Sequence, residues 1–281
     1  MTAAAPRPLR AADLSATLVV LGSGSKGNAF ALTCGDALLL VDAGFSCREI
    51  ERRLELAGLS LSGLVAIALT HEHGDHASGA TRLARKCSVP VVTSLGTFRA
   101  LARGGDPCDF LPLGTRGPVE VGPFMISACP TSHDAAEPVA IGITLPDGTA
   151  IGIAYDLGRP TQAVRWFLRG MHCLVIEANH DDTLLRTSGY PVVVQQRIAG
   201  PAGHLSNHDA GRLLDAVHHA ALNTVVLAHL SQRCNHPDTA RRDIAHCLAA
   251  LGFDGDLVVA LQDGPMTPIA VRGPLQRSLF R

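Results

Sequence analysis

The chain has 281 residues, of which 47% are hydrophobic and only 17% are charged, and its formal net charge is −1. This composition excludes an intrinsically disordered or acidic-tail protein and favours a compact globule with a sizeable core. The weak net charge provides no overall basic field to attract nucleic acid, but it does not exclude a local basic groove. Histidine is unusually frequent, with 13 residues, and it is the commonest metal ligand in proteins.

The N-terminus and the cysteines give no sign of export. Residues 1–15 are rich in alanine, proline and arginine, and we expect a flexible tail there, followed by a single domain over residues 16–281. No stretch is apolar enough for a signal peptide or a membrane span. The eight cysteines form no C-x-x-C pair, which argues against a zinc ribbon or a thioredoxin-type motif. We therefore expect reduced thiols, no membrane association and a cytoplasmic location.

Apolar runs, glycine turns and helical stretches alternate along the chain, a pattern that favours a layered α/β fold. Residues 18–41 contain two strands around a glycine-rich segment, and residues 47–57 are predicted to be helical. Residues 139–155 form two apolar runs around a Pro-Asp-Gly turn, which is typical of an antiparallel hairpin. A further helix is expected over residues 208–220.

Ionisable or metal-binding side chains follow five of the apolar runs, where each predicted strand ends. They are Asp42 after ALLLV, His71 after VAIALT, Asp156 after IGIAY, Glu177 after CLVI and His229 after NTVVLA. An alternative explanation is that polar residues commonly begin the loop after a strand. That explanation does not account for the preference for histidine and aspartate at these positions. Because layered α/β proteins commonly bind ligands just beyond the carboxyl ends of their strands, this pattern predicts one shared site.

The motif THEHGDH is the strongest local signal. It places four candidate metal ligands within six residues: His71, His73, Asp75 and His76. Side chains so close in sequence diverge, so two ions about 3.5–4 Å apart accommodate them better than one tetrahedral ion. Later loops supply further ligands: His133, Asp156 and His229. Imidazoles and carboxylates suit Zn²⁺ or Mn²⁺, so we expect two divalent ions per chain.

The motif and its distal partners together resemble the metallo-β-lactamase superfamily. Further segments resemble the WalJ/YycJ branch of that superfamily, from about residue 18 to about residue 262: LGSGSKGNAF, VDAGFS, IEANHD, YPVVVQQRI, GHLSN and LAHLSQRCN. The resemblance implies a four-layered αββα sandwich with a dinuclear site along one edge. It also implies a compact metal-dependent phosphodiesterase or nuclease, related to ribonuclease Z.

The resemblance also implies how the ligands are shared between the two ions. It assigns His71, His73 and His133 to the first ion, Asp75, His76 and His229 to the second, and Asp156 to a position between them. Asp134 is adjacent to His133 and could compete for a metal, but His133 follows the apolar run FMISAC as the strand-end rule expects. Asp42 is expected to orient a histidine rather than bind an ion, because ligating imidazoles usually give their other N–H to a carboxylate or carbonyl.

Hydrolysis of a diester with a poor leaving group needs a proton donor as well as a hydroxide held between two divalent ions. Glu177 and His204 suit the donor role, because a histidine held by a carboxylate can act as an acid near neutral pH. A Glu and a His stand in comparable contexts in ribonuclease Z. The alternative is that His204 only neighbours a helix cap formed by Ser206 or Asn207. Together with Asp75, Glu177 and His204 make up the predicted catalytic group.

Contacts to the substrate have weaker support in the sequence. The glycine-rich segment 22–28 carries Lys26 but lacks the ending of a P-loop, and a tight hairpin explains it equally well. Arg197 and Asn235 lie near the motif segments and are candidates for contact with a nucleic-acid backbone. The predicted substrate contacts are Ser25, Asn28, Asn207 and Arg233.

The residues and the resemblance together predict a dinuclear phosphodiesterase. We expect a nuclease of the 5′–3′ exonuclease type, which hydrolyses DNA or RNA with a metal-bridging hydroxide. Two dications can attract a phosphodiester without many lysines or arginines, so the weak net charge does not oppose a nucleic-acid partner. The alternatives are a small-molecule hydrolase of the same fold, such as a cyclic phosphate diesterase, lactonase or thioesterase, and a non-catalytic metal-binding scaffold.

Overall fold

The computed structural model describes residues 16–103, 108–114 and 117–274, so the tail expected over residues 1–15 lies outside the described residues. The described chain forms two sheets of seven strands each. The first sheet has the order β14 (Ile269–Val271), β1 (Ala16–Gly22), β2 (Ala29–Cys34), β3 (Ala37–Val41), β4 (Leu64–Ala68), β5 (Val91–Thr93) and β6 (Phe110–Pro112). The second has the order β7 (Val119–Val121), β8 (Phe124–Pro130), β9 (Val139–Thr144), β10 (Ala150–Ala154), β11 (Cys173–Glu177), β12 (Thr224–Ala228) and β13 (Asp256–Val259).

The two sheets share one pattern of strand pairing. In each, the first three pairs in that order are antiparallel and the last three pairs are parallel. By this correspondence β3 matches β10 and β4 matches β11. The carboxyl ends of the parallel strands of each sheet therefore lie at one edge of that sheet.

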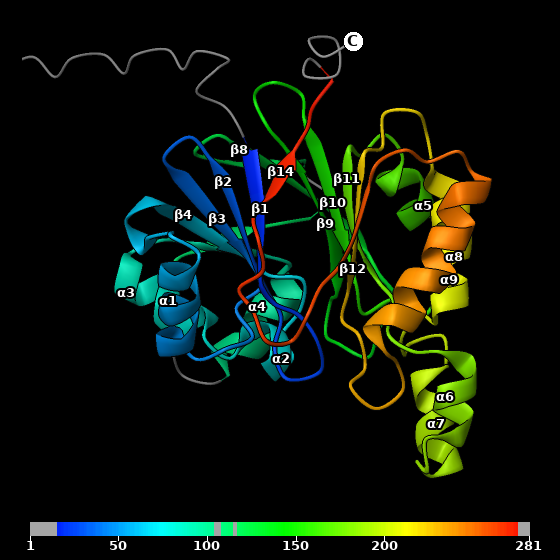
Figure 1. Ribbon diagram of the computed structural model, residues 1–281. Coiled ribbons are helices and arrows are strands. Elements are labelled where there is room, and N and C mark those ends of the chain that lie inside the picture. The colour runs from blue at the N-terminus through cyan, green and yellow to red at the C-terminus, as the bar shows by residue number, and fades with distance from the viewer. Residues whose placement is uncertain (1–15, 104–107, 115–116, 275–281) are drawn as a thin grey trace, which may run out of the picture.

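Helices cover the outer faces of both sheets (Figure 1). The helices of the described chain are α1 (Cys47–Leu56), α2 (Gly74–Ala77), α3 (Ala80–Cys87), α4 (Leu95–Ala102), α5 (Gln162–Leu168), α6 (Asp182–Thr187), α7 (Val192–Ile198), α8 (Asn207–Val217) and α9 (Pro237–Ala250), with a short 3₁₀ turn, η2 (Leu61–Gly63). Helices α1 and α3 pack on the first sheet, and α5, α8 and α9 pack on the second. The order of layers is therefore αββα, as expected.

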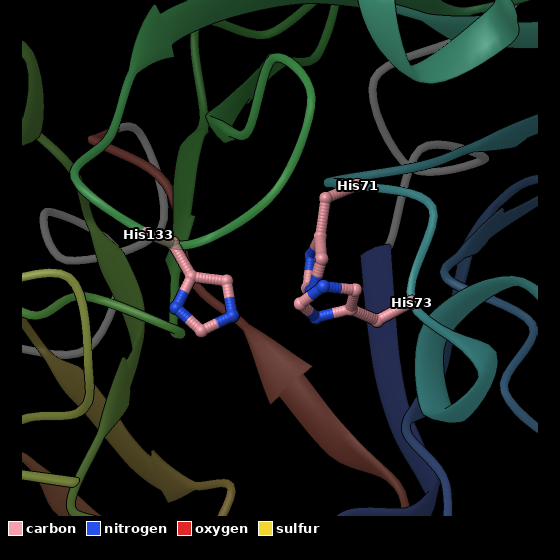
Figure 2. Close-up of side chains that lie close together, drawn as sticks. All are labelled: His71, His73 and His133. Atoms are coloured by element: carbon pink, nitrogen blue, oxygen red, sulfur yellow. The ribbon is translucent and has the colours of Figure 1, made fainter. Parts of the chain in front are cut away.

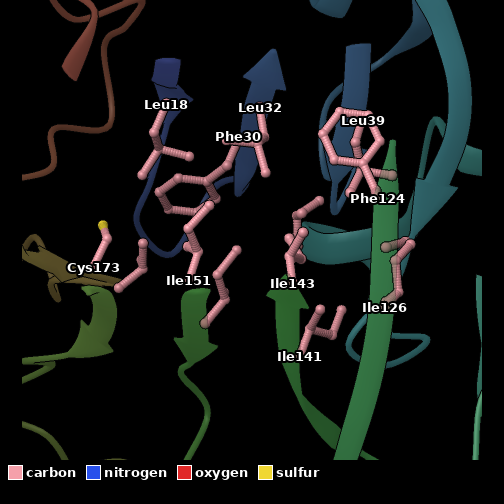
Figure 3. Packing of buried hydrophobic residues seen from close by; sticks show 14 of the residues in the cluster. Leu18, Phe30, Leu32, Leu39, Phe124, Ile126, Ile141, Ile143, Ile151 and Cys173 are labelled. Carbon is pink, nitrogen blue, oxygen red and sulfur yellow. The ribbon is translucent and has the colours of Figure 1, made fainter. Parts of the chain in front are cut away.

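The largest apolar cluster lies between the two sheets (Figure 3). Alternation along β1 shows how the sequence builds it: Leu18 and Val20 point into this cluster, whereas Val19 and Leu21 point toward the helices. Successive side chains of a strand face opposite sides of the sheet. Because both faces are covered, the strands read as continuous apolar runs rather than as alternating ones.

Most of the expected elements are confirmed. The helix expected over 47–57 is α1, and the hairpin expected over 139–155 consists of β9 and β10 in antiparallel register. The helix expected over 208–220 is α8, but it ends at Val217 because His218 adopts an extended backbone. No helix in the described parts of the chain is both long enough and apolar enough to cross a membrane.

Candidate metal centre

The predicted site residues follow strands of both sheets at the same edge of the sandwich. Asp42 follows β3 and His71 follows β4 in the first sheet, while Asp156, Glu177 and His229 lie at the ends of β10, β11 and β12. Helix α2, which directly follows His73, lies at this edge, toward the bottom of Figure 1. The strand-end pattern thus brings residues that are far apart in the sequence to one place.

Three of these strand exits adopt a left-handed backbone. The φ angles are 56° at Asp42, 53° at Asp156 and 55° at His229. Non-glycine residues rarely occupy this region, and when they do they cluster at functional sites, at a cost of about 1–3 kcal/mol each. Asp42 and Asp156 occupy corresponding positions after β3 and β10. The same sharp turn thus follows the equivalent strand of each sheet, and in both sheets it places a carboxylate at the site.

The described residues contain four overlapping clusters of candidate metal ligands, two of which are triplets that share no residue. The ligand atoms of each triplet lie within 4.8 Å of one another: His71, His73 and His133 in the first, and Asp75, His76 and His229 in the second. Figure 2 shows the three rings of the first triplet around a common space, with His133 facing the other two from a different loop. These are the same two sets that the family resemblance implies.

Asp156 lies between the two triplets. Its Oδ2 atom is 2.8 Å from Nε2 of His76 and 3.8 Å from Nε2 of His71. Its Oδ1 atom is 3.9 Å from Nε2 of His133 and 3.3 Å from Nδ1 of His229. One carboxylate thus reaches both triplets, which is the position expected of a bridging ligand.

The donor atoms fit divalent cations. Among the described residues, Nε2 of His71 is buried without a hydrogen-bond partner, and Oδ2 of Asp156 is buried with Nε2 of His76 at 2.8 Å. An unsatisfied buried polar group costs about 1–3 kcal/mol, so a cation bound to Nε2 of His71 would relieve that cost. Imidazole nitrogen and carboxylate oxygen together match the preferences of Zn²⁺ and Mn²⁺.

Four of the ligand histidines are held through the ring nitrogen Nδ1. His76 faces Oδ2 of Asp42 at 2.6 Å, and His71 faces the hydroxyl of Thr70 at 3.0 Å. His133 faces the carbonyl oxygen of Gly203 at 3.2 Å, and His229 faces Oε1 of Glu177 at 3.1 Å. With Nδ1 engaged in this way, Nε2 of each ring is the nitrogen left for a metal.

Asp42 is the centre of this support. It is fully buried, and besides His76 its carboxylate accepts hydrogen bonds from the backbone N–H and hydroxyl of Thr70 and from the hydroxyl of Tyr155, at 2.7–2.8 Å. The orienting role expected of Asp42 is therefore confirmed. Thr70 and Tyr155 were not predicted, because each reads in the sequence as the end of an apolar run.

Glu177 performs the same function for His204. Its Oε1 atom is 2.7 Å from Nδ1 of His204, and its Oε2 atom accepts the backbone N–H groups of Leu157 and Leu205. The side chain of His204 is 23% exposed, whereas that of Glu177 is fully buried. The helix cap that was considered as the alternative is also present, since the hydroxyl of Ser206 accepts the N–H of Asp209 at the start of α8. The cap and the contact between His204 and Glu177 therefore occur together.

Burial and charge shift the pKa values of two histidines in each triplet, and the direction differs between the triplets. Burial holds the pKa of His71 and of His133 below its ordinary value. Burial also lowers the pKa of His229, but the charge of Asp156 and the hydrogen bonds outweigh it and raise the pKa to about 9. The pKa of His76 is likewise raised by Asp156 and Asp42 against the effect of burial. A cation that binds the second triplet must therefore compete with protons more strongly than a cation that binds the first triplet.

Burial would raise the pKa values of the central carboxylates, but the surrounding imidazoles reverse this. The charges of His229 and His76 hold the pKa of Asp156 well below its ordinary value. The charge and the hydrogen bond of His204 hold the pKa of Glu177 at about 2. Both groups are therefore carboxylates at neutral pH, able to accept hydrogen bonds and to bind cations.

The ligands open into a cleft of about 230 Å³. Ser25, a predicted substrate contact, lines the cleft, and so do Arg197, a candidate for contact with a nucleic-acid backbone, and Asp134. The lining also includes residues that were not predicted as site residues: Asn179, Tyr190, Ile198 and Ser231. Asp134, the competing ligand considered for the first ion, pairs with Arg197 through Oδ2 at 2.5 Å, and its Oδ1 lies 3.3 Å from Nε2 of His133. Tyr190 and Asn179 stand in segments that resemble the WalJ/YycJ branch, YPVVVQQRI and IEANHD, but the resemblance was not used to assign either residue to the site.

The structure corrects three of the predicted substrate contacts. Asn28 is fully buried, and its side-chain amide bonds to Gly24 and lies 3.2 Å from Nε2 of His76. Asn207 is also buried, with its amide hydrogen-bonded to Asn235 and Asp243. Arg233 does not line the described cleft, because its guanidinium stacks on the ring of Tyr190. Proximity to a motif in sequence does not determine which way a side chain faces.

Comparisons with known proteins agree with this geometry. A model of the beta-lactamase superfamily domain matches residues 38–230. Exodeoxyribonuclease YycJ from Bacillus anthracis is 32% identical over 237 residues, which are 83% of this chain and 89% of that protein. Exodeoxyribonuclease WalJ from Streptococcus pneumoniae is 30% identical over 240 residues, 82% and 87% of the two chains.

A solved structure shows the same fold. The metallo-beta-lactamase fold protein YhfI from Bacillus subtilis superimposes with a TM-score of 0.66 at 18% identity, covering 88% of this chain and 97% of that one. The family match and the two relatives span most of the sequence that builds both sheets. The chain therefore belongs to the metallo-β-lactamase superfamily, in its WalJ/YycJ branch of metal-dependent hydrolases.

Proposed function

We propose that this protein is a two-metal phosphodiesterase, a nuclease that removes nucleotides from the 5′ end of DNA. The observation that carries the proposal is the pair of triplets joined by Asp156, with His204 beside them in the same cleft. The names of the two relatives, both exodeoxyribonucleases, support nucleic acid and favour DNA over RNA.

Each group in the cleft has a distinct role in this proposal. His71, His73 and His133 would hold one divalent ion and Asp75, His76 and His229 would hold the other, with Asp156 between the two sets. The ions, Zn²⁺ or Mn²⁺, would supply an activated water and neutralise charge that develops on the phosphate. Asp75 borders the cleft with 29% of its side chain exposed, so it lies close to the reacting phosphate.

His204 is the proposed proton donor to the leaving oxygen. Its Nδ1 is engaged by Glu177 at 2.7 Å, so Nε2 is the nitrogen that can serve the substrate. Burial lowers the pKa of His204, but the charge of Glu177 and the hydrogen bonds raise it well above its ordinary value. The raised pKa favours the protonated ring that a general acid needs.

Two remaining expectations belong to this proposal. Residues 16–281 act as one hydrolase domain, which is supported by the single apolar cluster that both sheets contribute to. The protein works in the cytoplasm, which is supported by its eight cysteines, none of which forms a disulfide in the described parts of the chain, since cytosolic proteins seldom form disulfides.

A substrate panel tests the proposal. Metal-replete protein is incubated with 5′- and 3′-labelled DNA and RNA in single- and double-stranded form, an aryl phosphodiester, an aryl ester and a lactam, with Asp75→Ala as control. We expect mononucleotides from the 5′ end of DNA, and no product with the variant. Cleavage of only the ester or the lactam would show instead a small-molecule hydrolase of the same fold. A folded protein that binds metal but cleaves none of these substrates would be a scaffold.

A further inference from the structure

One wall of the cleft has no role in the chemistry described above. It comes from the segment between α6 and α7, which projects at the lower right of Figure 1. Tyr190 stands in this segment and lines the cleft together with the metal ligands. Among the described residues that line it, Tyr190 is the only aromatic residue other than the histidines. A tyrosine ring beside a phosphodiester site is a candidate surface for a nucleobase.

The backbone holds Tyr190 in a defined turn. Gly189 precedes it with a φ of 73°, a conformation that glycine adopts readily. The backbone N–H of Tyr190 donates to the hydroxyl of Ser188 at 3.2 Å, and the side-chain amide of Gln195 donates to its carbonyl oxygen at 2.8 Å. The residue is therefore fixed from both sides of the turn, and its half-buried ring has little freedom to leave the cleft.

Arg233 covers one face of the tyrosine ring. Its guanidinium carbon lies 4.2 Å from the centre of the Tyr190 ring, within the range of a cation–π contact. The Nε–H of Arg233 also donates to the carbonyl oxygen of Ser188 at 2.9 Å. Arg233 belongs to the loop that begins at His229, so the ring is tied to a loop that carries a candidate metal ligand. Because the guanidinium of Arg233 covers one face of the Tyr190 ring, the opposite face and the edge of the ring are the parts that can border the cleft.

We propose that Tyr190, supported from behind by Arg233, is a stacking platform for the nucleobase next to the phosphate that is cleaved. This inference rests on the proposed nuclease function. Aromatic side chains bind unpaired bases in this way without sequence preference, because every base has a π-face. The arrangement therefore predicts a subsite for any of the four bases and a requirement that the terminal nucleotide be unstacked from its neighbour.

The test compares oligonucleotides with and without the base that Tyr190 would contact. Single-stranded DNA carries either a normal nucleotide or a tetrahydrofuran abasic residue at its first or second 5′ position. We expect Tyr190→Ala to raise KM for normal DNA about 5-fold to 100-fold, with a much smaller effect on one of the abasic substrates. Tyr190→Phe keeps the ring and should retain most of the affinity, and Arg233→Ala should fall between the two.

Two controls separate stacking from damage to the fold. Trp166→Ala removes an aromatic side chain that is 76% exposed on α5, outside the cleft, and should change neither KM nor kcat. Binding of fluorescently labelled DNA is also measured in an Asp75→Ala background, where no cleavage interferes, and circular dichroism checks that each variant is folded. We expect Tyr190→Ala to weaken binding there by a similar factor.

The possible failures are distinguishable. If wild-type protein cleaves DNA and Tyr190→Ala behaves like it, the stacking platform is refuted and the nuclease function stands. The same holds if Tyr190→Ala weakens normal and abasic substrates equally, since the ring would then support the cleft rather than contact a base. If wild-type protein neither cleaves nor binds DNA, both proposals are overturned.

Discussion

The Oδ2 atom of Asp42 lies 2.6 Å from Nδ1 of His76, and both side chains are completely buried. The contact orients the imidazole so that its Nε2 faces Asp75 at 3.4 Å and Asp156 at 2.8 Å. Asp42 also receives the hydroxyl groups of Thr70 and Tyr155. A residue that touches no predicted metal position directly thus controls the direction of a candidate ligand.

Asp42→Asn should weaken metal binding about 10-fold to 100-fold, the usual effect of losing a carboxylate that supports a ligand. Asparagine is similar in size to aspartate, but its NH₂ group would face the hydroxyl and N–H groups that now donate to the carboxylate of Asp42. Calorimetric titration with Zn²⁺ and Mn²⁺ measures the change. Asp238→Asn, on a side chain that is 90% exposed, is the matched control. Equal affinities for the two variants would contradict the orienting role.

Metal removal should both inactivate and destabilise the protein. Chelation leaves Nε2 of His71 buried without a partner among the described residues, and Oδ2 of Asp156 with Nε2 of His76 in place of a cation. Metal at about 100 times its Kd would contribute roughly 2.7 kcal/mol of stability through binding to the folded state alone. We therefore expect a lower Tm after dialysis against a chelator, with recovery of Tm and cleavage when Mn²⁺ or Zn²⁺ is restored. An unchanged Tm would argue against a metal at these atoms.

His204→Ala should slow the cleavage of DNA about 10²-fold to 10⁴-fold, the usual contribution of a general acid. A diester with an activated aryl leaving group needs no proton, so its hydrolysis should fall much less. His208→Ala, at the second residue of α8 with a 70% exposed side chain, serves as control. The two substrates are compared by kcat/KM. Equal losses on both substrates would remove the proton-donor role from His204.

The two triplets should differ in how their metal affinity depends on pH. The pKa of His229 is raised to about 9 and that of His76 is also raised, so these rings carry protons at neutral pH that a metal must displace. Raising the pH removes those protons and strengthens binding in the second triplet. The pKa values of His71 and His133 are lowered, so the first triplet binds over a wider range.

Metal titrations at about pH 6 and about pH 8 check this difference. We expect one tightly bound ion at the lower pH and two at the higher pH, with more protons released by the second ion. Calorimetry in buffers of different ionisation enthalpy counts those protons. Two sites with the same pH dependence would contradict the assignment of charges around Asp156.

The layers and the clustering of the candidate ligands could be predicted from the sequence because their causes are local. Apolar runs with turns between them predict strands, and parallel strands necessarily end at one edge, which brought Asp156 and His229 to the motif around His71. The role of Asp42 followed from the same rule. Because Asp42 directly follows β3, its place at this edge can be predicted without knowing how distant parts of the chain pack.

The parts that were missed depend on tertiary placement. The hydroxyl of Tyr155 reaches Asp42 across the space between the two sheets, and a sequence shows no spacing that predicts such a contact. Asn28 was predicted to contact substrate because its loop is rich in glycine, yet the backbone turns its amide inward to Gly24. Tyr190 reaches the cleft only because the segment between α6 and α7 packs against Arg233.

The central claim is that two metal ions, held by the triplets around Asp156, together support phosphodiester cleavage. The most direct measurement is the rate of 5′ nucleotide release from DNA as metal-free protein is titrated with Mn²⁺ or Zn²⁺ at about pH 8, with bound metal counted in parallel. The account predicts two ions per chain and a rate that rises only with the second. Full activity with one ion bound, or no cleavage with both sites filled, would contradict it.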